Sequence, residues 1–132
     1  MKRLVLLLAV AVASCGETAP PAPVLLTAWR TGETADGTWH VRWRPLVEPI
    51  PLGEPFGLAI EVEGAPELVV IEVDAEMPHH GHGMNFIPQV SGSNGAWIAK
   101  GLLFHMPGRW ELSIDVLKDG ITERAQWTLE IE

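Results

Sequence analysis

The sequence contains one cysteine and no tyrosine, and basic residues are scarce. A single cysteine excludes a framework of intramolecular disulfides and any zinc or iron–sulfur site that needs several thiolates. Lys and Arg number nine against seventeen Asp and Glu, which gives a formal net charge of −8 at pH 7. A surface this acidic repels phosphate, so nucleic acid is a poor partner for this chain.

Apolar residues and turn formers are plentiful in the 132 residues. Hydrophobic residues make up 47% of the chain and charged residues 20%, a balance typical of a folded domain and not of a disordered segment. Eleven prolines and thirteen glycines indicate many turns in a chain of this length. These features favour an all-β fold.

The N-terminal segment has the pattern of an export signal. Lys2 and Arg3 precede an apolar run over 4–13, which is shorter than the roughly 20 residues that span a bilayer. The run leads into Val-Ala-Ser-Cys at 12–15, which resembles the lipobox of bacterial lipoproteins. This resemblance implies that Cys15 is lipidated and becomes the new N-terminus. The alternative is an ordinary secretory signal with an incidental cysteine.

Cleavage before Cys15 defines the predicted domain organisation. The signal peptide is 1–14, the lipidated cysteine and a proline-rich tether occupy 15–23, and one β-domain spans 24–132. Gly16 stands where an aspartate would indicate inner-membrane retention, which favours the outer membrane over the inner one. The expected location is therefore the cell envelope, where the lipid would anchor the domain to the membrane on the periplasmic side.

The rest of the chain alternates between apolar and polar residues, as strands do when one face lies on a core. The clearest alternation predicts strands at 39–43, 58–62, 69–73, 110–116 and 127–131. Weaker patterns predict strands at 24–30 and 96–104. Turns are predicted between them at 32–37, 49–53, 63–66, 91–95 and 118–120. About seven or eight strands predict an immunoglobulin-like antiparallel β-sandwich, with most tryptophans in the core.

Metal-binding chemistry is concentrated in the segment 77–84, Met-Pro-His-His-Gly-His-Gly-Met. If this segment is extended, His80, His82 and Met84 project to one side, with about 6.6 Å between neighbours. Imidazole and thioether together suit copper, because soft sulfur selects Cu(I) and imidazole accepts either oxidation state. Zinc prefers thiolate or carboxylate beside imidazole. The candidate ligands here are Met77, His79, His80, His82 and Met84.

A second His–Met pair ends a predicted strand in Phe104-His105-Met106-Pro107-Gly108. Neighbouring residues in a strand face opposite sides, so His105 and Met106 join one site only if the chain turns. Pro107-Gly108 permits such a turn. His105 and Met106 therefore complete the set of candidate metal ligands.

A structural role is the alternative for each of these residues. Loops rich in Gly, His and Met can be plain turns, and short motifs often match by chance. Met77 and Met84 are equally consistent with the edge of the core. His40 lies between arginines on a polar face, and we interpret it as a surface residue.

The two segments resemble the YtkA-like domain family, which is similar to FixH-like proteins. The stretches that carry this resemblance are 74–84 and 101–112, and it extends over about 45–132. Met-Pro-x-His-Gly-His-Gly and Met-Pro-Gly-x-Trp match at 77–83 and 106–110. The resemblance implies an exported or membrane-anchored immunoglobulin-like sandwich associated with copper handling and respiratory oxidase assembly. FixH-like members usually keep a transmembrane helix, which a lipid would replace here.

The sequence thus predicts a lipid-anchored periplasmic protein that binds copper, as Cu(I) or Cu(II), through its His and Met loop. It would buffer copper or exchange it with a copper-donating or copper-accepting protein. The alternative is a structural or protein-interaction module in envelope or respiratory-complex assembly that holds no metal. The sequence contains no zinc-protease His-Glu-x-x-His, no Gly-x-Ser-x-Gly and no phosphate-binding glycine loop, so we predict no enzymatic activity.

Overall fold

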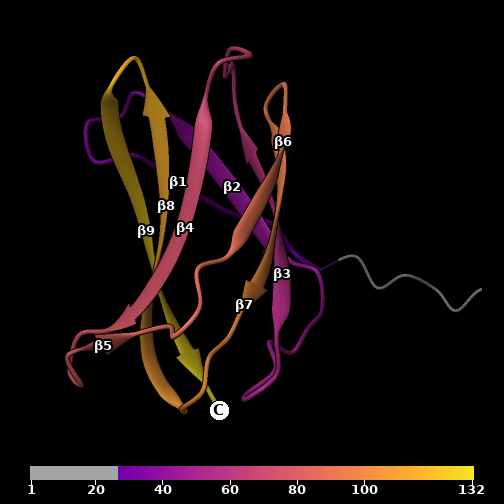
Figure 1. The fold of residues 1–132 in the computed structure, drawn as a ribbon, viewed down its shortest axis with the longest axis vertical. Coiled ribbons are helices and arrows are strands. Elements are labelled where there is room, and N and C mark those ends of the chain that lie inside the picture. Colours follow the sequence, from indigo (N-terminus) through magenta and orange to yellow (C-terminus); the bar gives the residue numbers. More distant parts are fainter. Residues whose placement is uncertain (1–26) are drawn as a thin grey trace, which may run out of the picture.

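The computed structural model describes residues 27–132, so the predicted signal peptide, Cys15 and the tether lie outside the described residues. The described part forms two facing antiparallel sheets without helices, which confirms the predicted all-β sandwich (Figure 1). Its strands are β1 (Arg30–Glu33), β2 (His40–Pro45), β3 (Phe56–Val62), β4 (Val70–Met77), β5 (His82–Gly83), β6 (Gln89–Ser93), β7 (Ala96–Leu102), β8 (Gly108–Lys118) and β9 (Ile121–Ile131). Over this range there is no helix that is long and apolar enough to cross a membrane.

The strand order is that of an immunoglobulin-like domain. One sheet has the order β1-β2-β3-β7-β6 and the other has β5-β4-β8-β9. The series β2-β3-β7-β6 and β4-β8-β9 correspond to the A-B-E-D and C-F-G sheets of a constant-type immunoglobulin domain. The short strands β1 and β5 extend the sheets at their edges.

The strand count and several strand and turn boundaries differ from the sequence prediction. Nine strands lie in the described part, where about seven or eight were predicted. A strand over 24–30 is wrong for the part that the structure describes, because 27–29 is irregular and β1 begins only at Arg30. Trp29 instead stacks against the guanidinium groups of Arg42 and Arg44, at 4.7 and 5.0 Å from its ring centre.

The predicted turn at 91–95 is mostly strand. β6 has the sequence Gln-Val-Ser-Gly-Ser, whose polar and small residues resemble a loop. The turn itself is the pair Asn94-Gly95, whose φ angles are 54° and 85°. Two consecutive positive φ angles are typical of the type I′ turn that joins hairpin strands. An equivalent pair, Asp119-Gly120, joins β8 to β9 with φ angles of 51° and 78°.

The core lies between the sheets and is built from the apolar residues of each alternating strand. β4 alternates strictly between exposed and buried residues. The largest fully buried side chains include Trp43 from one sheet and Trp110 from the other. Burying a large apolar side chain contributes about 1.5–3 kcal/mol, so this double layer stabilises the frame that presents the loops.

Candidate metal site

The first candidate segment forms a tight hairpin at one end of the sandwich. β4 ends at Met77, and the carbonyl of Met77 accepts hydrogen bonds from the N–H groups of His80 and Gly81, both at 3.0 Å. Gly81 has a φ of 68°, a left-handed conformation that glycine adopts without strain. An extended segment from His80 onward is therefore wrong, because His80 lies in the turn. The strand spacing begins only at His82.

His82 and Met84 project toward the interior of the sandwich end. His82 is the register partner of Met77, whose side chain is buried. Met84 follows two residues later and donates its N–H to the carbonyl of Ala75 at 3.0 Å. Cross-strand partners share a face of the sheet, so His82 and Met84 share the inner face with Met77 and Ala75. Both are half-buried.

The second candidate segment reaches the same place from the connection between β7 and β8. The chain bends at Met106-Pro107, and the indole N–H of Trp110 donates a hydrogen bond to the carbonyl of Met106 at 3.0 Å. A Cβ added to Gly108 would lie 3.2 Å from the Sδ-bound methyl carbon of Met77. The bend therefore folds over Met77, and it is the turn that Pro107-Gly108 was predicted to permit.

Three imidazole rings lie in a row at this end. The ring centres of His80 and His82 are 5.7 Å apart, and those of His82 and His105 are 5.2 Å apart. A metal–nitrogen bond of about 2.0 Å, with about 1.1 Å more to each ring centre, separates two rings on one ion by roughly 5–6 Å. Both observed separations fall in this range, so the spacing of the rings is compatible with an ion shared between His82 and one neighbour.

Two of these rings carry an unpaired buried nitrogen. The Nδ1 atoms of His82 and His105 are buried and have no hydrogen-bond partner among the described residues. An unpaired buried polar atom costs about 1–3 kcal/mol. A metal ion bound at these atoms would offset that cost, so the imidazoles fit a metal ligand set.

The three methionines of the two segments lie at different depths. Met77 is 1% exposed and lies beneath the bend, whereas Met84 and Met106 are half-buried and pack against the core. Met84 and Met106 therefore combine core packing with partial access, and Met77 is chiefly a core residue. His79 is exposed on the turn, and no ring contact joins it to the other imidazoles of the described chain.

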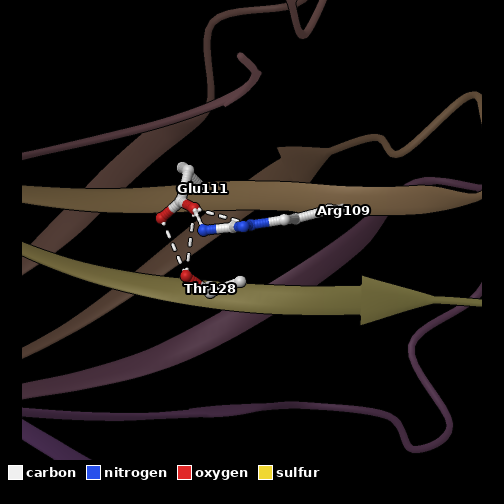
Figure 2. Close-up of polar contacts among 3 residues, drawn as sticks. All are labelled: Arg109, Glu111 and Thr128. Atoms are coloured by element: carbon white, nitrogen blue, oxygen red, sulfur yellow. Dashed lines mark hydrogen bonds and ion pairs between the residues drawn. The ribbon is translucent and has the colours of Figure 1, made fainter. Parts of the chain in front are cut away.

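Two carboxylates of the neighbouring sheet face are engaged in hydrogen bonds of their own. Glu111 accepts hydrogen bonds from Arg109 at 2.9 Å and from the hydroxyl of Thr128 at 3.0 Å, as Figure 2 shows. The carboxylate of Asp74 accepts the N–H of Ala75 at 2.8 Å. Across 27–132, no group of three or more His, Cys, Asp or Glu side chains is arranged to hold a metal ion.

A hollow in the described part lies away from the imidazole row. It has a volume of about 790 Å³ and is lined by residues of β1, β2 and β3 together with the turn between β6 and β7. His40 belongs to this hollow, where its Nδ1 lies 3.1 Å from Glu33. The predicted ligand residues do not line the hollow, and His40 keeps the surface role assigned to it.

Trp110 has a role that sequence reasoning did not assign. It was predicted only as a core residue, but its ring lies 5.5 Å from that of His105 and its N–H holds the bend. The signal that could have revealed this role is its spacing, four residues after Met106 in the Met-Pro-Gly-x-Trp stretch. That spacing lets one side chain both fill the core and close the loop.

Comparisons with protein-family models, with curated proteins and with solved structures give no match to this chain. The resemblance to the YtkA-like family therefore stays a prediction that rests on its two motifs.

Proposed function

We propose that this protein binds copper at the imidazole row and buffers it or exchanges it with a partner protein. The observation that carries the proposal is the meeting of His82 and His105. His82 lies in β5 and His105 in the connection between β7 and β8. Their ring centres are 5.2 Å apart, and each ring has a buried Nδ1 without a partner in the described chain. A metal ion bound between these imidazoles would give the unpaired nitrogens a partner.

Copper fits this donor set better than zinc. His82 can share an ion with His80 or with His105, since no three His, Cys, Asp or Glu side chains of the described chain form a metal-binding group. The thioethers of Met84 and Met106, at the edge of the core, are the remaining candidate donors. Thioether sulfur is a soft ligand that selects Cu(I), whereas zinc sites draw on thiolate and carboxylate. His80 is exposed and the other groups are half-buried, which leaves a path for ligand exchange with a partner and requires no catalysis.

The proposed location follows from the N-terminal segment. A signal peptide over 1–14 and lipidation at Cys15 would attach the domain to the periplasmic face of the envelope. Replacement of Cys15 by serine should abolish incorporation of radiolabelled palmitate and release the protein from the membrane fraction. Labelling that survives this replacement would contradict the lipoprotein assignment and leave the metal site untouched.

The metal proposal is tested by titrating the full-length protein, purified in detergent, with Cu(I) under reducing conditions and with Cu(II). Loss of a hydrogen-bond partner that only supports a ligand lowers metal affinity by up to about 100-fold. The variants His82→Ala and His105→Ala remove a ligand itself, so each should weaken binding by more than this. His40→Ala is the matched control, because this histidine contacts Glu33 instead of the imidazole row. Unchanged affinity in the His82 and His105 variants would refute the site.

The thioether ligands are tested by volume-conserving replacements. Met84→Leu and Met106→Leu keep the apolar packing and remove the sulfur. We expect the double variant to lose affinity for Cu(I) while its affinity for Cu(II) stays close to that of the wild type, since only Cu(I) prefers thioether. Equal losses for both ions would indicate disturbed packing and not lost ligands.

A metal-free interaction module is the second candidate, and one observation favours it. Phe86 and Ile87, which follow β5, are 58% and 93% exposed. Exposed large apolar residues beside a loop often mark a protein contact. If this candidate is correct, a crosslinked partner of the wild type should persist in the presence of a copper chelator and be lost in Phe86→Ser/Ile87→Ser.

A further inference from the structure

β4 is paired along its length on one side only. β8 pairs with it from Val70 to Glu76, whereas β5 pairs with Glu76 and Met77 alone. Figure 1 shows β5 against only the final part of β4. On this side, residues 70–74 have no partner strand within the described chain. This stretch of β4 is an open edge of the sheet.

The existing hydrogen bonds show which backbone groups face the open edge. The carbonyl of Ala75 accepts from the N–H of Met84, on the β5 side, while the carbonyl of Asp74 accepts from the hydroxyl of Ser113, on the β8 side. Alternate residues of an antiparallel strand bond to opposite neighbours. Ile71 and Val73 therefore direct their N–H and C=O groups toward the open edge.

The side chains along this edge are acidic on one face and apolar on the other. Glu72, Asp74 and Glu76 are exposed on the outer face, whereas Ile71 and Val73 are buried on the inner face. None of the three acids forms an ion pair with a described residue. The pKa of Arg124 is raised chiefly by its hydrogen bonds to Asp115 and also by the charges of Asp74 and Glu76, so this arginine offsets part of their negative charge. The remaining negative charge is available to a strand laid alongside.

We propose that the open edge of β4 binds an extended segment of a partner protein in which basic residues alternate with apolar ones. The backbone of the segment would bond to Ile71 and Val73 and add a strand that continues the line of β5. Its basic side chains would lie beside Glu72 and Asp74, since opposite charges on neighbouring strands attract. Its apolar side chains would face the inner side of the sheet.

A second copy of the same chain is disfavoured by charge. In the antiparallel register that uses both bonding residues, Ile71 faces Val73 of the other copy. That register places the two Glu72 side chains directly opposite each other, and like charges in this position are destabilising. The acids that prevent pairing between copies therefore select a basic strand. This edge runs into β5 and so leads toward His82, but its recognition chemistry needs no metal.

The test uses the full-length protein, purified in detergent, and two synthetic peptides, Lys-Val-Lys-Val-Lys-Val and Glu-Val-Glu-Val-Glu-Val. The lysine peptide should bind, slow amide hydrogen exchange at Ile71 and Val73 by about tenfold or more, and dissociate as salt screens the charges. The glutamate peptide should not bind. The metal is left out of both titrations, so that their outcome is independent of the copper proposal.

A charge-swapped variant provides the decisive comparison. Glu72→Lys/Asp74→Lys should weaken binding of the lysine peptide by about tenfold and allow the glutamate peptide to bind. Glu130→Lys/Glu132→Lys makes the same change in net charge at the end of β9 and should alter neither affinity. The proposal is overturned if the lysine peptide does not bind at millimolar concentration, or if its binding protects other amides. It is also overturned if the free protein dimerises with these two amides protected.

Discussion

Two fully buried tryptophans should respond differently to the same substitution. Trp110 and Trp43 are both 0% exposed and lie in opposite sheets of one core. The indole N–H of Trp110 is bonded to the carbonyl of Met106, whereas that of Trp43 is buried and has no partner among the described residues. Replacement by phenylalanine removes the N–H from both sites and leaves an aromatic ring in each.

The volume lost is the same at both sites, so the hydrogen bonds decide the difference. Each replacement leaves a cavity of about 40 Å³, which costs roughly 1 kcal/mol at ~24 cal/mol per Å³, besides lost apolar burial. Trp110→Phe also loses a hydrogen bond and leaves the Met106 carbonyl unpaired, which costs about 1–3 kcal/mol. Trp43→Phe instead removes an unpaired buried donor and recovers a similar amount. We expect Trp110→Phe to be less stable than Trp43→Phe by about 2 kcal/mol or more.

Urea unfolding measures this difference, and copper titration extends it to the site. Because the Trp110 bond holds the bend that carries His105, Trp110→Phe should also weaken copper binding, whereas Trp43→Phe should leave it unchanged. Equal losses of unfolding free energy in the two variants would refute the hydrogen-bond argument. A larger loss in Trp43→Phe would refute it as well.

Four further predictions concern the frame of the sandwich. Arg124→Ala breaks a two-bonded pair with Asp115, both bonds at 2.7 Å, and should lower the unfolding free energy in urea by about 1 kcal/mol because the arginine is half exposed. Burial and the neighbouring carboxylate of Asp36 raise the pKa of Glu123, so the melting temperature of the wild type should fall as pH rises above about 4.5. In Glu123→Gln this fall should be absent. Burial alone would raise the pKa of Asp36, but its hydrogen bonds outweigh this effect and lower the pKa to about 2. The wild type should therefore lose stability as pH falls from about 4 toward 2, and Asp36→Asn should already lack that stability at higher pH. Gly92→Ala should disrupt β6, because at a φ of 148° its Cβ would lie 2.2 Å from a backbone carbonyl oxygen. Circular dichroism melting should show a larger loss of stability than for Gly53→Ala, where the φ of 75° is also left-handed but no atom lies within 4 Å of the added Cβ.

Alternation identified the strands that contribute most to the core. β4 and β8 each have one apolar face, because a residue that alternates with polar neighbours must lie on one side of a sheet. β6 escaped detection because its Ser and Gly residues form an edge with little to bury. The 24–30 pattern misled for the opposite reason: Trp29 is apolar but stacks on arginines outside the core.

Some features of the candidate site depend on residues close in sequence, and others depend on strands that are far apart along the chain. His82 and Met84 share a face because they are two residues apart in an extended segment, which the sequence states directly. The turn at His80 depends on the hydrogen bonds to the Met77 carbonyl, which the alternation pattern does not predict. His105 meets His82 because β4 and β8 are neighbours in the sheet, so the connection before β8 ends beside the hairpin after β4.

The sequence by itself determined the fold class and the kind of chemistry available, because strand alternation and ligand type are properties of residues and their immediate neighbours. Only the tertiary structure decided which imidazoles lie together, which ring nitrogens are left unpaired and which edge of β4 stays open. Those outcomes depend on how the two sheets cross and on the register of strands that are far apart along the chain. No local pattern specifies such distances, since each is set by the packing of the whole core.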